Sequence, residues 1–588
     1  MAATPSSFYV MLALTTLPFL LLLTVPTEAR PLTPAETSQL DRFIQEVTRC
    51  ARIPALSVSL VGGDGEVVYE KGYGQQSPTG QRNPVTTDTV FCLGSSTQAF
   101  TSVLLAALLS YNENKTFDTP LHDIIGSRVH LPGRFRTEFV NLKDVLGMRT
   151  GISNMDMLVA AYGMNRYRLM RDLRFAPEVA GFREENVFSE ILFPLAEDAA
   201  RALGGDTWYK LLRQYIFNPL GMDSVSFIHV DAKDNNQLAT PVVSYNGKLI
   251  PIPMDSYKGQ EIVAAASSVC LSTRDMTKWI HFIISGGKTM TGEQVVSEDA
   301  LKSTFKALQP RSNGGDTRSN GFSQPTMQVS FTRESNALGW IKGNYRGYTF
   351  VSQDGSLPGY ESLTTILPDR NIGVFTAFTG DGGARAYAAK TLINSFALDL
   401  LLQGQPWVKF GDACPVMEKM SDATKAAEPK PFYVGGRGKE IRPLTDYEAT
   451  YRLYGFGDVM VKRNGSGLLR LEYGELGHYI LHPAARNDTF TMHAVPGPMW
   501  FTTHADDYVR KPFLAIFGTR NDDPNAGIET VTIPHFARDM DPVFSRHPIV
   551  PRHYADEYDQ QCDACAALAA SVSVLVASVL AAMFGFGR

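Results

Sequence analysis

Apolar positions along the chain predict a domain that mixes strands with helices. Residues 55–61 and 66–72 are β-rich runs on either side of Gly62-Gly63-Asp64-Gly65, which indicates a hairpin. Residues 95–109 are apolar on almost every side, as expected of a helix buried inside a domain. Residues 302–334 are rich in Ser, Asn, Gly and Gln and predict a long loop or insertion. Strands and then a helix are predicted at 348–351, 361–367, 372–378 and 384–402.

The pattern changes after this helix. Residues 403–431 contain prolines and charges, which predicts a linker. From 432 to 545, short alternating runs recur between Gly, Asn and Asp, which is typical of a small antiparallel barrel or sandwich. The predicted organisation is therefore a first domain over 30–402, the linker, a small β domain over 432–545 and a stalk over 546–563.

Both ends of the chain are apolar. Residues 8–25 carry no charge and precede Thr27-Glu28-Ala29, which predicts a signal peptide over 1–29, with a signal anchor as the alternative. The tail over 564–588 is uncharged up to Phe586 and is long enough to cross ~30 Å of hydrocarbon. It predicts either a membrane span or a glycolipid-anchor signal, with a packed helix as the remaining alternative. We therefore expect a secreted or cell-surface protein that is held on a membrane by its tail.

Composition narrows the class of protein. The residues are 44% hydrophobic and 20% charged, which is ordinary for a folded protein. A chain of 588 residues is too long for one hydrophobic core, so at least two domains are expected. The net charge of −5 comes without a long basic run, so nucleic-acid binding is not expected. Three glycosylation sequons fit export, at Asn114, Asn464 and Asn487. The cysteines are too few for a disulfide scaffold of this size, and their pairing stays open: Cys50, Cys92, Cys270, Cys414, Cys562 and Cys565.

Several common catalytic devices are missing from the sequence, which has no Gly-x-Ser-x-Gly elbow. Residues 435–439 superficially suggest a phosphate loop, but Glu440 stands where Ser or Thr is needed, so a flexible loop is favoured. His478 and His482 lie four residues apart, but in a β-rich segment this spacing does not place them on one face of a helix, so they are not interpreted as a pair of metal ligands. The histidines form no metal-ligand cluster, and we expect neither a metal nor a cofactor.

One segment carries candidate chemistry. Residues 91–101 read Phe-Cys-Leu-Gly-Ser-Ser-Thr-Gln-Ala-Phe-Thr. This segment resembles the Ser-x-x-Lys motif that opens the nucleophile helix of class C β-lactamases and serine peptidases. In that family the Lys shares a helix face with the Ser and takes the proton of its hydroxyl. Ser95 stands at the nucleophile position, but Gln98 holds the Lys position, and an amide cannot accept a proton near neutral pH.

The resemblance continues over about 40–402. Phe188-Ser189-Glu190 falls where the family carries Tyr-x-Asn, and Gln353-Asp354-Gly355 falls where a strand beside the cleft carries Lys or His, one residue and Gly. Residues 142–151 and 215–222 also resemble family segments. The resemblance implies an α/β (α+β) fold, with an antiparallel sheet and a helical subdomain. The segment from 432 on is similar to the small β-barrel domain that follows the catalytic domain in some relatives.

The departures from the family motifs weigh against its chemistry. Phe188 lacks the phenol oxygen that helps to move protons, and Glu190 replaces a neutral amide by a carboxylate. Gln353 removes a cation that would bind a substrate carboxylate, and groups that act as a unit fail together. Ser95 alone says little, because Ser is also favoured as a helix N-cap. The sequence predicts a non-catalytic extracellular protein, a pseudoenzyme that acts as a binding or matrix component.

An alternative stays open, in which the protein is a serine hydrolase, either an esterase or a peptidase. Ser95 would be its nucleophile and Glu190 its base, since the family's Tyr-x-Asn loop lies beside the nucleophile. A carboxylate in an apolar pocket next to Phe188 could have a raised pKa suited to that work. Neither hypothesis identifies the ligand, the substrate or the matrix.

Overall fold

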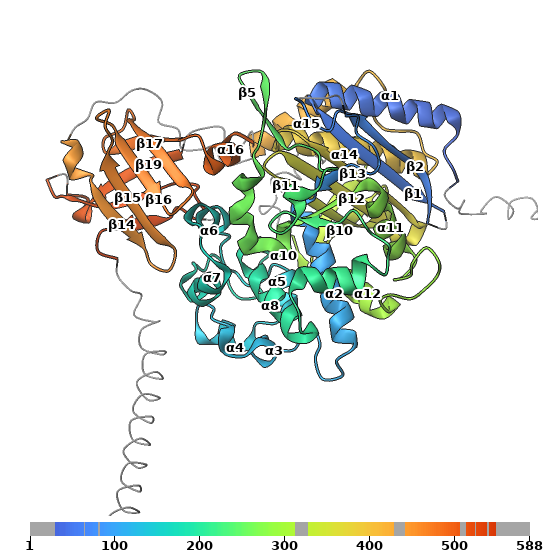
Figure 1. The fold of residues 1–588 in the computed structure, drawn as a ribbon, viewed down its shortest axis with the longest axis horizontal. Coiled ribbons are helices and arrows are strands. Elements are labelled where there is room, and N and C mark those ends of the chain that lie inside the picture. The colour runs from blue at the N-terminus through green and yellow to red at the C-terminus, as the bar shows by residue number, and fades with distance from the viewer. Residues whose placement is uncertain are drawn as a thin grey trace, which may run out of the picture.

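A computed structural model describes residues 30–311, 327–427, 442–505 and 513–548, with short gaps at 64, 80–82, 524 and 538–539. Figure 1 shows a large body of sheet and helices joined to a smaller barrel. The predicted signal peptide, residues 435–439, most of the stalk and the tail lie outside the described residues. Within the described ranges, no helix combines the length and the apolar character that a membrane span requires.

The large body is built on an eight-stranded sheet whose neighbouring strands pair antiparallel. Three central strands are buried on every residue, so both of their faces are covered by other parts of the domain. The predicted hairpin and the three predicted strands between 348 and 378 are confirmed. In sheet order the strands are β2 (Glu66–Gly74), β1 (Ala55–Gly62), β13 (Ile372–Thr379), β12 (Tyr360–Leu367), β11 (Tyr348–Leu357), β10 (Ile341–Tyr345), β9 (Phe331–Asn336) and β8 (Gln309–Pro310).

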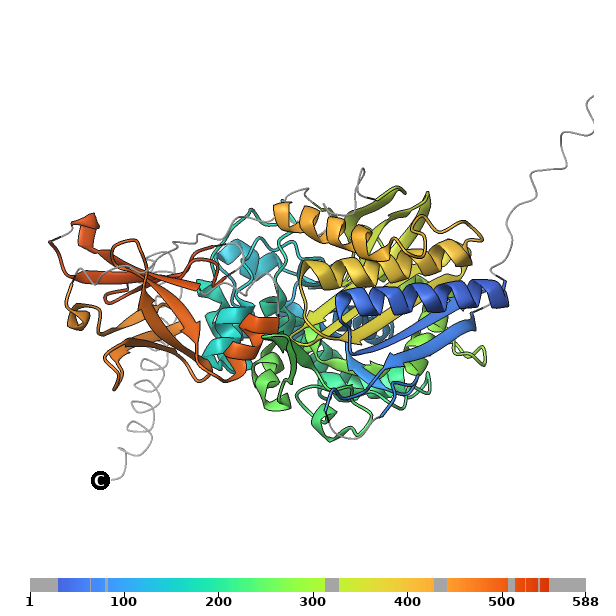
Figure 2. The same cartoon turned by 90° about the horizontal axis from the view of Figure 1, so that it is seen from above.

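Three helices lie side by side over one face of this sheet, as Figure 2 shows: α1 (Pro34–Ala51), α14 (Ala384–Leu401) and α15 (Ala413–Ala427). The disulfide Cys50–Cys414 joins α1 to α15. The segment 403–431, expected to be a linker, therefore contains a packed helix. Ala413, Met417 and Met420 share one side of α15 and join the core above the sheet, a pattern that the prolines and charges of the segment obscure.

The opposite face of the sheet carries the helical subdomain. Its central helix is α2 (Thr97–Ser110), which is buried along nearly its whole length, as predicted. The 3-10 turn η1 (Gly94–Ser96) precedes α2 directly. Residues 302–334, expected as one loop, contain the end of a helix, β8 and part of β9, while 312–326 lie outside the described residues. The helices packed on α2 include α8 (Phe193–Gly204), α9 (Trp208–Leu212), α10 (Ala264–Ser267) and α12 (Glu298–Thr304).

The smaller body is a closed antiparallel barrel, so the prediction of a small antiparallel β domain is confirmed. Its interior is filled by inward-facing apolar and aromatic side chains that alternate with exposed ones. The strands are β14 (Ala449–Leu453), β15 (Gly457–Arg463), β16 (Leu469–Tyr473), β17 (Gly477–Pro483), β18 (Thr489–Ala494), β19 (Phe513–Thr519), β20 (Ile528–Thr532) and β21 (Val543–Ser545).

The barrel docks directly on the large body at α6 (Asp156–Tyr162). The backbone N–H of Glu475 donates to the carbonyl of Tyr162 at 3.2 Å, and that of Leu476 donates to Ala161 at 3.0 Å. The rings of Tyr162 and Tyr473 lie 5.2 Å apart between centroids. A second contact is made by α16 (Pro498–Ala505), which packs on β5 (Val242–Tyr245) of the large body. Backbone hydrogen bonds between the two bodies give this junction a defined register.

Candidate active site

Ser95 lies where β3 (Val90–Cys92) passes through η1 into the buried helix α2. Its side chain is half-buried, and its hydroxyl donates to Oε1 of Glu190 at 2.6 Å. The residues at the N-cap positions of η1 and α2 are Leu93 and Ser96, and neither makes a side-chain capping bond. Ser95 therefore does not serve as the helix N-cap, and its hydroxyl is directed at a carboxylate instead.

Glu190 opens the 3-10 turn η4 (Glu190–Leu192) and is only 7% exposed. The same Oε1 that accepts from Ser95 also accepts from Nε2 of Gln98 at 3.1 Å. The backbone N–H of Glu190 donates to Oδ1 of Asn154 at 3.2 Å, which fixes the start of the turn. The structure thus brings Ser95, Gln98 and Glu190 into direct contact. Asn154 is a positioning residue that no motif in the sequence singled out.

The remaining two motif positions border this group. Phe188 lies two residues before Glu190 and packs, half-buried, against the main core. On β11, a Cβ added to Gly355 would overlap the carbonyl oxygen of Leu93, so the Gly355 face of the strand is directed at η1. Gln353 is two residues earlier on the same strand and shares that face, because side chains alternate along a strand. All five predicted positions therefore belong to one region of the molecule.

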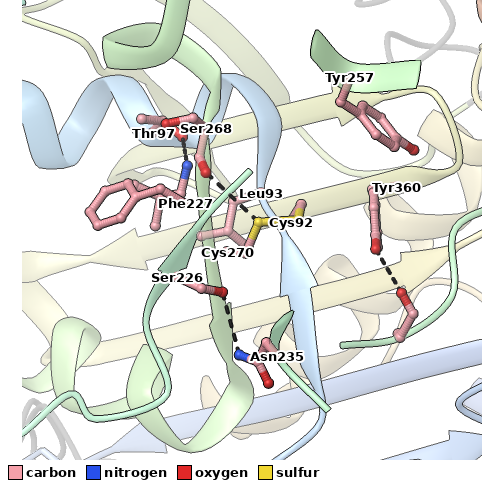
Figure 3. Close-up of a disulfide and its surroundings, with 12 residues drawn as sticks. Cys92, Leu93, Thr97, Ser226, Phe227, Asn235, Tyr257, Ser268, Cys270 and Tyr360 are labelled. Carbon is pink, nitrogen blue, oxygen red and sulfur yellow. Dashed lines mark hydrogen bonds between the residues drawn. A yellow bond between two sulfur atoms is a disulfide. The ribbon is translucent and has the colours of Figure 1, made fainter. Parts of the chain in front are cut away.

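A disulfide lies directly before the nucleophile segment. Cys92 on β3 and Cys270 on β7 (Val269–Ser272) are cross-strand partners and are bonded to each other (Figure 3). Thr97, in the first turn of α2, accepts a hydrogen bond from the backbone N–H of Val269 at 3.0 Å. Strand β7 therefore holds both the strand that leads to Ser95 and the helix that follows it. Cysteine spacing alone left this pairing open.

Two buried tyrosines hold the turn that joins β11 to β12. The hydroxyl of Tyr257 donates to the carbonyl of Pro358, and that of Tyr360 donates to Ala239 at 2.6 Å. Figure 3 shows both rings beside the β3–β7 region. Burial raises the pKa of each phenol well above its usual range, so both stay protonated and donate. They fix the position of the strand that passes η1.

The other predicted positions are spread over the surface. Asn114 and Asn487 are exposed, and Asn464 is half-buried with Oδ1 accepting backbone bonds from Ser466 and Leu468. His478 and His482 both lie on β17, where a spacing of four residues separates them by about 13 Å. Across the described part of the chain, no group of three or more His, Cys, Asp or Glu is arranged to hold a metal ion.

Comparison with known proteins agrees with this geometry. The family profile described as Beta-lactamase matches residues 40–398, more than half of the chain. This chain belongs to the Beta-lactamase family. The antiparallel sheet with a helical subdomain and the C-terminal barrel are the fold that the resemblance implied, so that prediction is confirmed.

Its relatives include proteins named as hydrolases. Unguisins hydrolase ungD' of Aspergillus campestris is 26% identical over 335 residues, which cover 55% of this chain and 58% of that protein. Gigasin-6 of Magallana gigas is 25% identical over 42% of this chain and 82% of its own length. The chain thus spans about three fifths of the hydrolase that it matches.

A solved structure extends the likeness in fold. The octameric penicillin-binding protein homologue from Pyrococcus abyssi superposes with a TM-score of 0.53 and 19% identity. The match covers 87% of this chain and all of that one, so it includes the barrel as well as the large body. At this identity the likeness concerns the fold alone.

Proposed function

We propose that this protein is a serine hydrolase of ester or amide bonds, with Ser95 as nucleophile and Glu190 as its general base. The observation that carries the proposal is the 2.6 Å hydrogen bond from the Ser95 hydroxyl to a carboxylate that is almost wholly buried. A carboxylate can accept the hydroxyl proton, whereas the amide of Gln98 cannot. The relatives named as unguisins hydrolases support this choice over the non-catalytic hypothesis.

The proposed reaction needs only the groups in contact. Glu190 takes the Ser95 proton while the hydroxyl oxygen attacks the carbonyl carbon, and the resulting tetrahedral intermediate carries the negative charge on its oxygen. As that intermediate collapses, the carbon–leaving-group bond breaks and Glu190 returns the proton to the leaving group. In the second half of the reaction, Glu190 takes a proton from water while the water oxygen attacks the acyl-Ser95 ester. Glu190 then returns that proton to the Ser95 oxygen as the ester bond breaks. Phe188 has no acidic hydrogen, so Glu190 performs both proton transfers.

Two backbone N–H groups can serve the oxyanion of this intermediate. The N–H of Ser95 belongs to the first turn of a helix and has no acceptor in a preceding turn. A Cβ added to Gly94 would lie 2.8 Å from the backbone nitrogen of Ser356, so the Ser356 N–H is next to the nucleophile segment. Strand β10 pairs with β11 only as far as Ser352, which leaves this edge of β11 outside that pairing. We assign the oxyanion hole to these two donors.

The charges at the site favour a neutral substrate. The Glu190 carboxylate repels an acidic group near the reacting carbonyl, and the Gln353 amide offers no positive charge to a substrate carboxylate. The family's basic residue on this strand would bind a substrate with a free carboxylate next to the scissile bond. Such a substrate is therefore disfavoured here. An ester or an internal amide without a neighbouring carboxylate fits the site.

We also propose that the protein acts outside the cell. Two disulfides join distant segments, and such bonds persist in oxidising compartments. This supports the expected secretion. Glycans at Asn114, Asn464 and Asn487 and membrane attachment through the tail are proposed from the sequence alone. A binding or matrix role remains a prediction of the sequence, and no contact among the described residues favours it over hydrolysis.

Turnover of neutral aryl esters tests the proposed function. The purified protein should hydrolyse them, Ser95→Ala should abolish turnover, and Glu190→Gln should lower kcat by roughly 10²–10⁴, the usual contribution of a general base. A carboxylate-bearing version of the same ester should react more slowly than its neutral parent. If wild-type protein shows no turnover above the Ser95→Ala variant, the non-catalytic hypothesis is the correct one.

A further inference from the structure

A buried lysine stands behind the strand that borders the active site. Lys390 is on α14, is 1% exposed, and lies on the face of the sheet opposite to η1. Its ammonium meets the carboxylates of Asp354 and Glu361 at 2.5 Å each. It also donates to the backbone carbonyl of Gly355 at 3.0 Å. The two carboxylates balance the charge of the buried ammonium, but charge balance does not account for its additional bond to a backbone carbonyl next to the active site.

The bond to Gly355 acts on the peptide group that supplies one of the two oxyanion donors. The carbonyl of Gly355 and the N–H of Ser356 belong to the same planar peptide unit. In a trans peptide they point in opposite directions, so a cation at the carbonyl oxygen lies behind an N–H that points away from it. That N–H lies beside Gly94, on the nucleophile side of β11.

The surrounding contacts hold this peptide in one place. Ser356 and Glu361 are directly opposite each other on β11 and β12, and the Ser356 hydroxyl donates to Oε1 of Glu361 at 2.6 Å. The other carboxylate oxygen of Glu361 accepts from Lys390. Burial raises the pKa of Glu361, opposed by the ammonium of Lys390. The lysine therefore contacts residues 354, 355 and 361 at once and holds them in fixed positions relative to one another.

We infer that Lys390 is a positioning residue for catalysis: it fixes the Gly355–Ser356 peptide and polarises it, so that the Ser356 N–H is a stronger donor to the developing oxyanion. Hydrogen bonds in chains strengthen one another in a medium of low dielectric constant, and a charged donor has the largest effect. The inference rests on the proposed hydrolase function. It assigns a catalytic purpose to a residue that no sequence motif marks.

The experiment compares Lys390→Met with the wild-type protein in two measurements. One is kcat and KM for a neutral aryl ester. The other is the Kd of phenylboronic acid, which forms a tetrahedral adduct with the Ser95 oxygen and places a boronate oxygen in the oxyanion hole. Since the contact matters only when the oxyanion is present, kcat and boronate affinity should each fall about tenfold or more, while KM stays within about twofold.

Arg333→Met is the matched control. Arg333 approaches Asp354 at 3.7 Å in the same buried cluster, whereas Lys390 is the group that donates to Gly355. This variant should lose stability but keep its boronate affinity. The double variant Lys390→Met, Glu361→Gln removes one cation and one carboxylate and leaves the Arg333–Asp354 pair intact. It should fold, yet still bind boronate weakly.

Three results would overturn the inference. One is Lys390→Met with kcat and boronate affinity within about twofold of wild type. Another is an equal loss in Arg333→Met, because the cluster would then be merely structural. The third is the double variant with full boronate affinity. Boronate binding separates the two proposals, since a wild type that binds boronate at Ser95 without turning over esters disproves the hydrolase function but still tests Lys390.

Discussion

Where the family has an ionisable lysine this protein has the neutral amide of Gln98, and where the family has a neutral asparagine it has the ionisable carboxylate of Glu190. The ionisable and the neutral group have thus exchanged positions. The ionisable group is now on η4, and the amide is on α2, where it donates to Glu190 at 3.1 Å. A carboxylate beside Ser95 can accept a proton as the family's amine does, with the opposite charge. This exchange explains why two departures that each look inactivating can together preserve a base at the nucleophile.

Restoring only the family's lysine should therefore reduce activity. In Gln98→Lys the ammonium would lie close to Glu190, where a cation stabilises the ionised carboxylate and weakens it as a base. We expect kcat/KM for a neutral ester to fall at least about tenfold. Gln98→Met, which removes the donor without adding charge, should lose only a few-fold. A gain of activity in Gln98→Lys would contradict the assignment of Glu190 as base.

Glu197 on α8 provides a test by pH. Burial raises its pKa to about 7, opposed by its ion pair with Arg166 and assisted by the neighbouring carboxylates of Asp198 and Glu261. Because the folded pKa lies above the unfolded one, the native state binds the proton more tightly, and stability falls as pH rises from about 4.5 to 7.

The measurement is chemical denaturation of wild type and Glu197→Gln at pH 5 and pH 8. The difference in unfolding free energy between variant and wild type should shift in favour of the variant at the higher pH, while groups common to both cancel. A difference that does not change with pH, or that changes in the opposite direction, would show that burial does not control this carboxyl group.

The elements around the site are held by close backbone contacts. Strand β11 passes so near to η1 that a Cβ on Gly355 would overlap the Leu93 carbonyl. The Ser362 hydroxyl donates to that same carbonyl at 2.8 Å, which ties β12 to it as well. The glycine of the family's strand motif is kept here because no side chain fits between a strand and a turn at this distance.

Gly355→Ala should therefore damage both stability and activity. The neighbour is backbone, which cannot rotate away, and overpacking of this kind lowers the free energy of unfolding by about 1–3 kcal/mol. Gly465→Ala is the control, since no atom lies within 4 Å of its added Cβ. Urea denaturation and ester turnover measure the two effects. Equal stability of the two variants would mean that β11 does not pack on η1 as described.

Sequence patterns predict these elements unevenly. The hairpin β1–β2 and the strands β11 to β13 follow from local β-rich runs and the turn residues between them, and the helix α2 follows from a segment that is apolar on almost every side. Helix α15 is not predicted because the prolines and charges of the segment obscure the spacing of its apolar residues. The disulfide Cys50–Cys414 spans 364 residues, and a pairing over that distance depends on the tertiary fold.

The site shows the same limit. The family resemblance located Ser95, Gln98, Glu190 and Gln353 and placed the loop of Glu190 beside the nucleophile, but it did not give the hydrogen bonds among these side chains. Ser95 and Glu190 are 95 residues apart in the sequence. Only the folded structure shows that their side chains are within hydrogen-bond distance, close enough for proton transfer. Lys390 could not be found at all, because a lysine in a helix is usually a solvent-exposed residue.

At the scale of the whole molecule, the barrel is fastened to the large body through α6. A Cβ on Gly474 would overlap the backbone of Tyr162, so the barrel approaches the helix backbone directly. Gly474 also has a positive φ of 58°, which favours glycine. The junction therefore depends on this close approach as well as on the two backbone hydrogen bonds.

Gly474→Ala should uncouple the two bodies. We expect calorimetry to show two separate unfolding transitions in place of a single cooperative one, because the junction no longer fits. Gly467→Ala is the matched control, since it has a positive φ of 80° in the same barrel but no atom within 4 Å of its added Cβ. If both variants unfold alike, backbone strain and not docking is responsible.

The most direct test of the central claim is the detection of an acyl group on Ser95. The protein is mixed with a neutral aryl ester, quenched within the first turnover, digested and measured by mass spectrometry. The account predicts an acyl group on the peptide that contains Ser95, absent in Ser95→Ala and formed roughly 10²–10⁴ times more slowly in Glu190→Gln. No acylation of wild type, or acylation at an undiminished rate in Glu190→Gln, would contradict it.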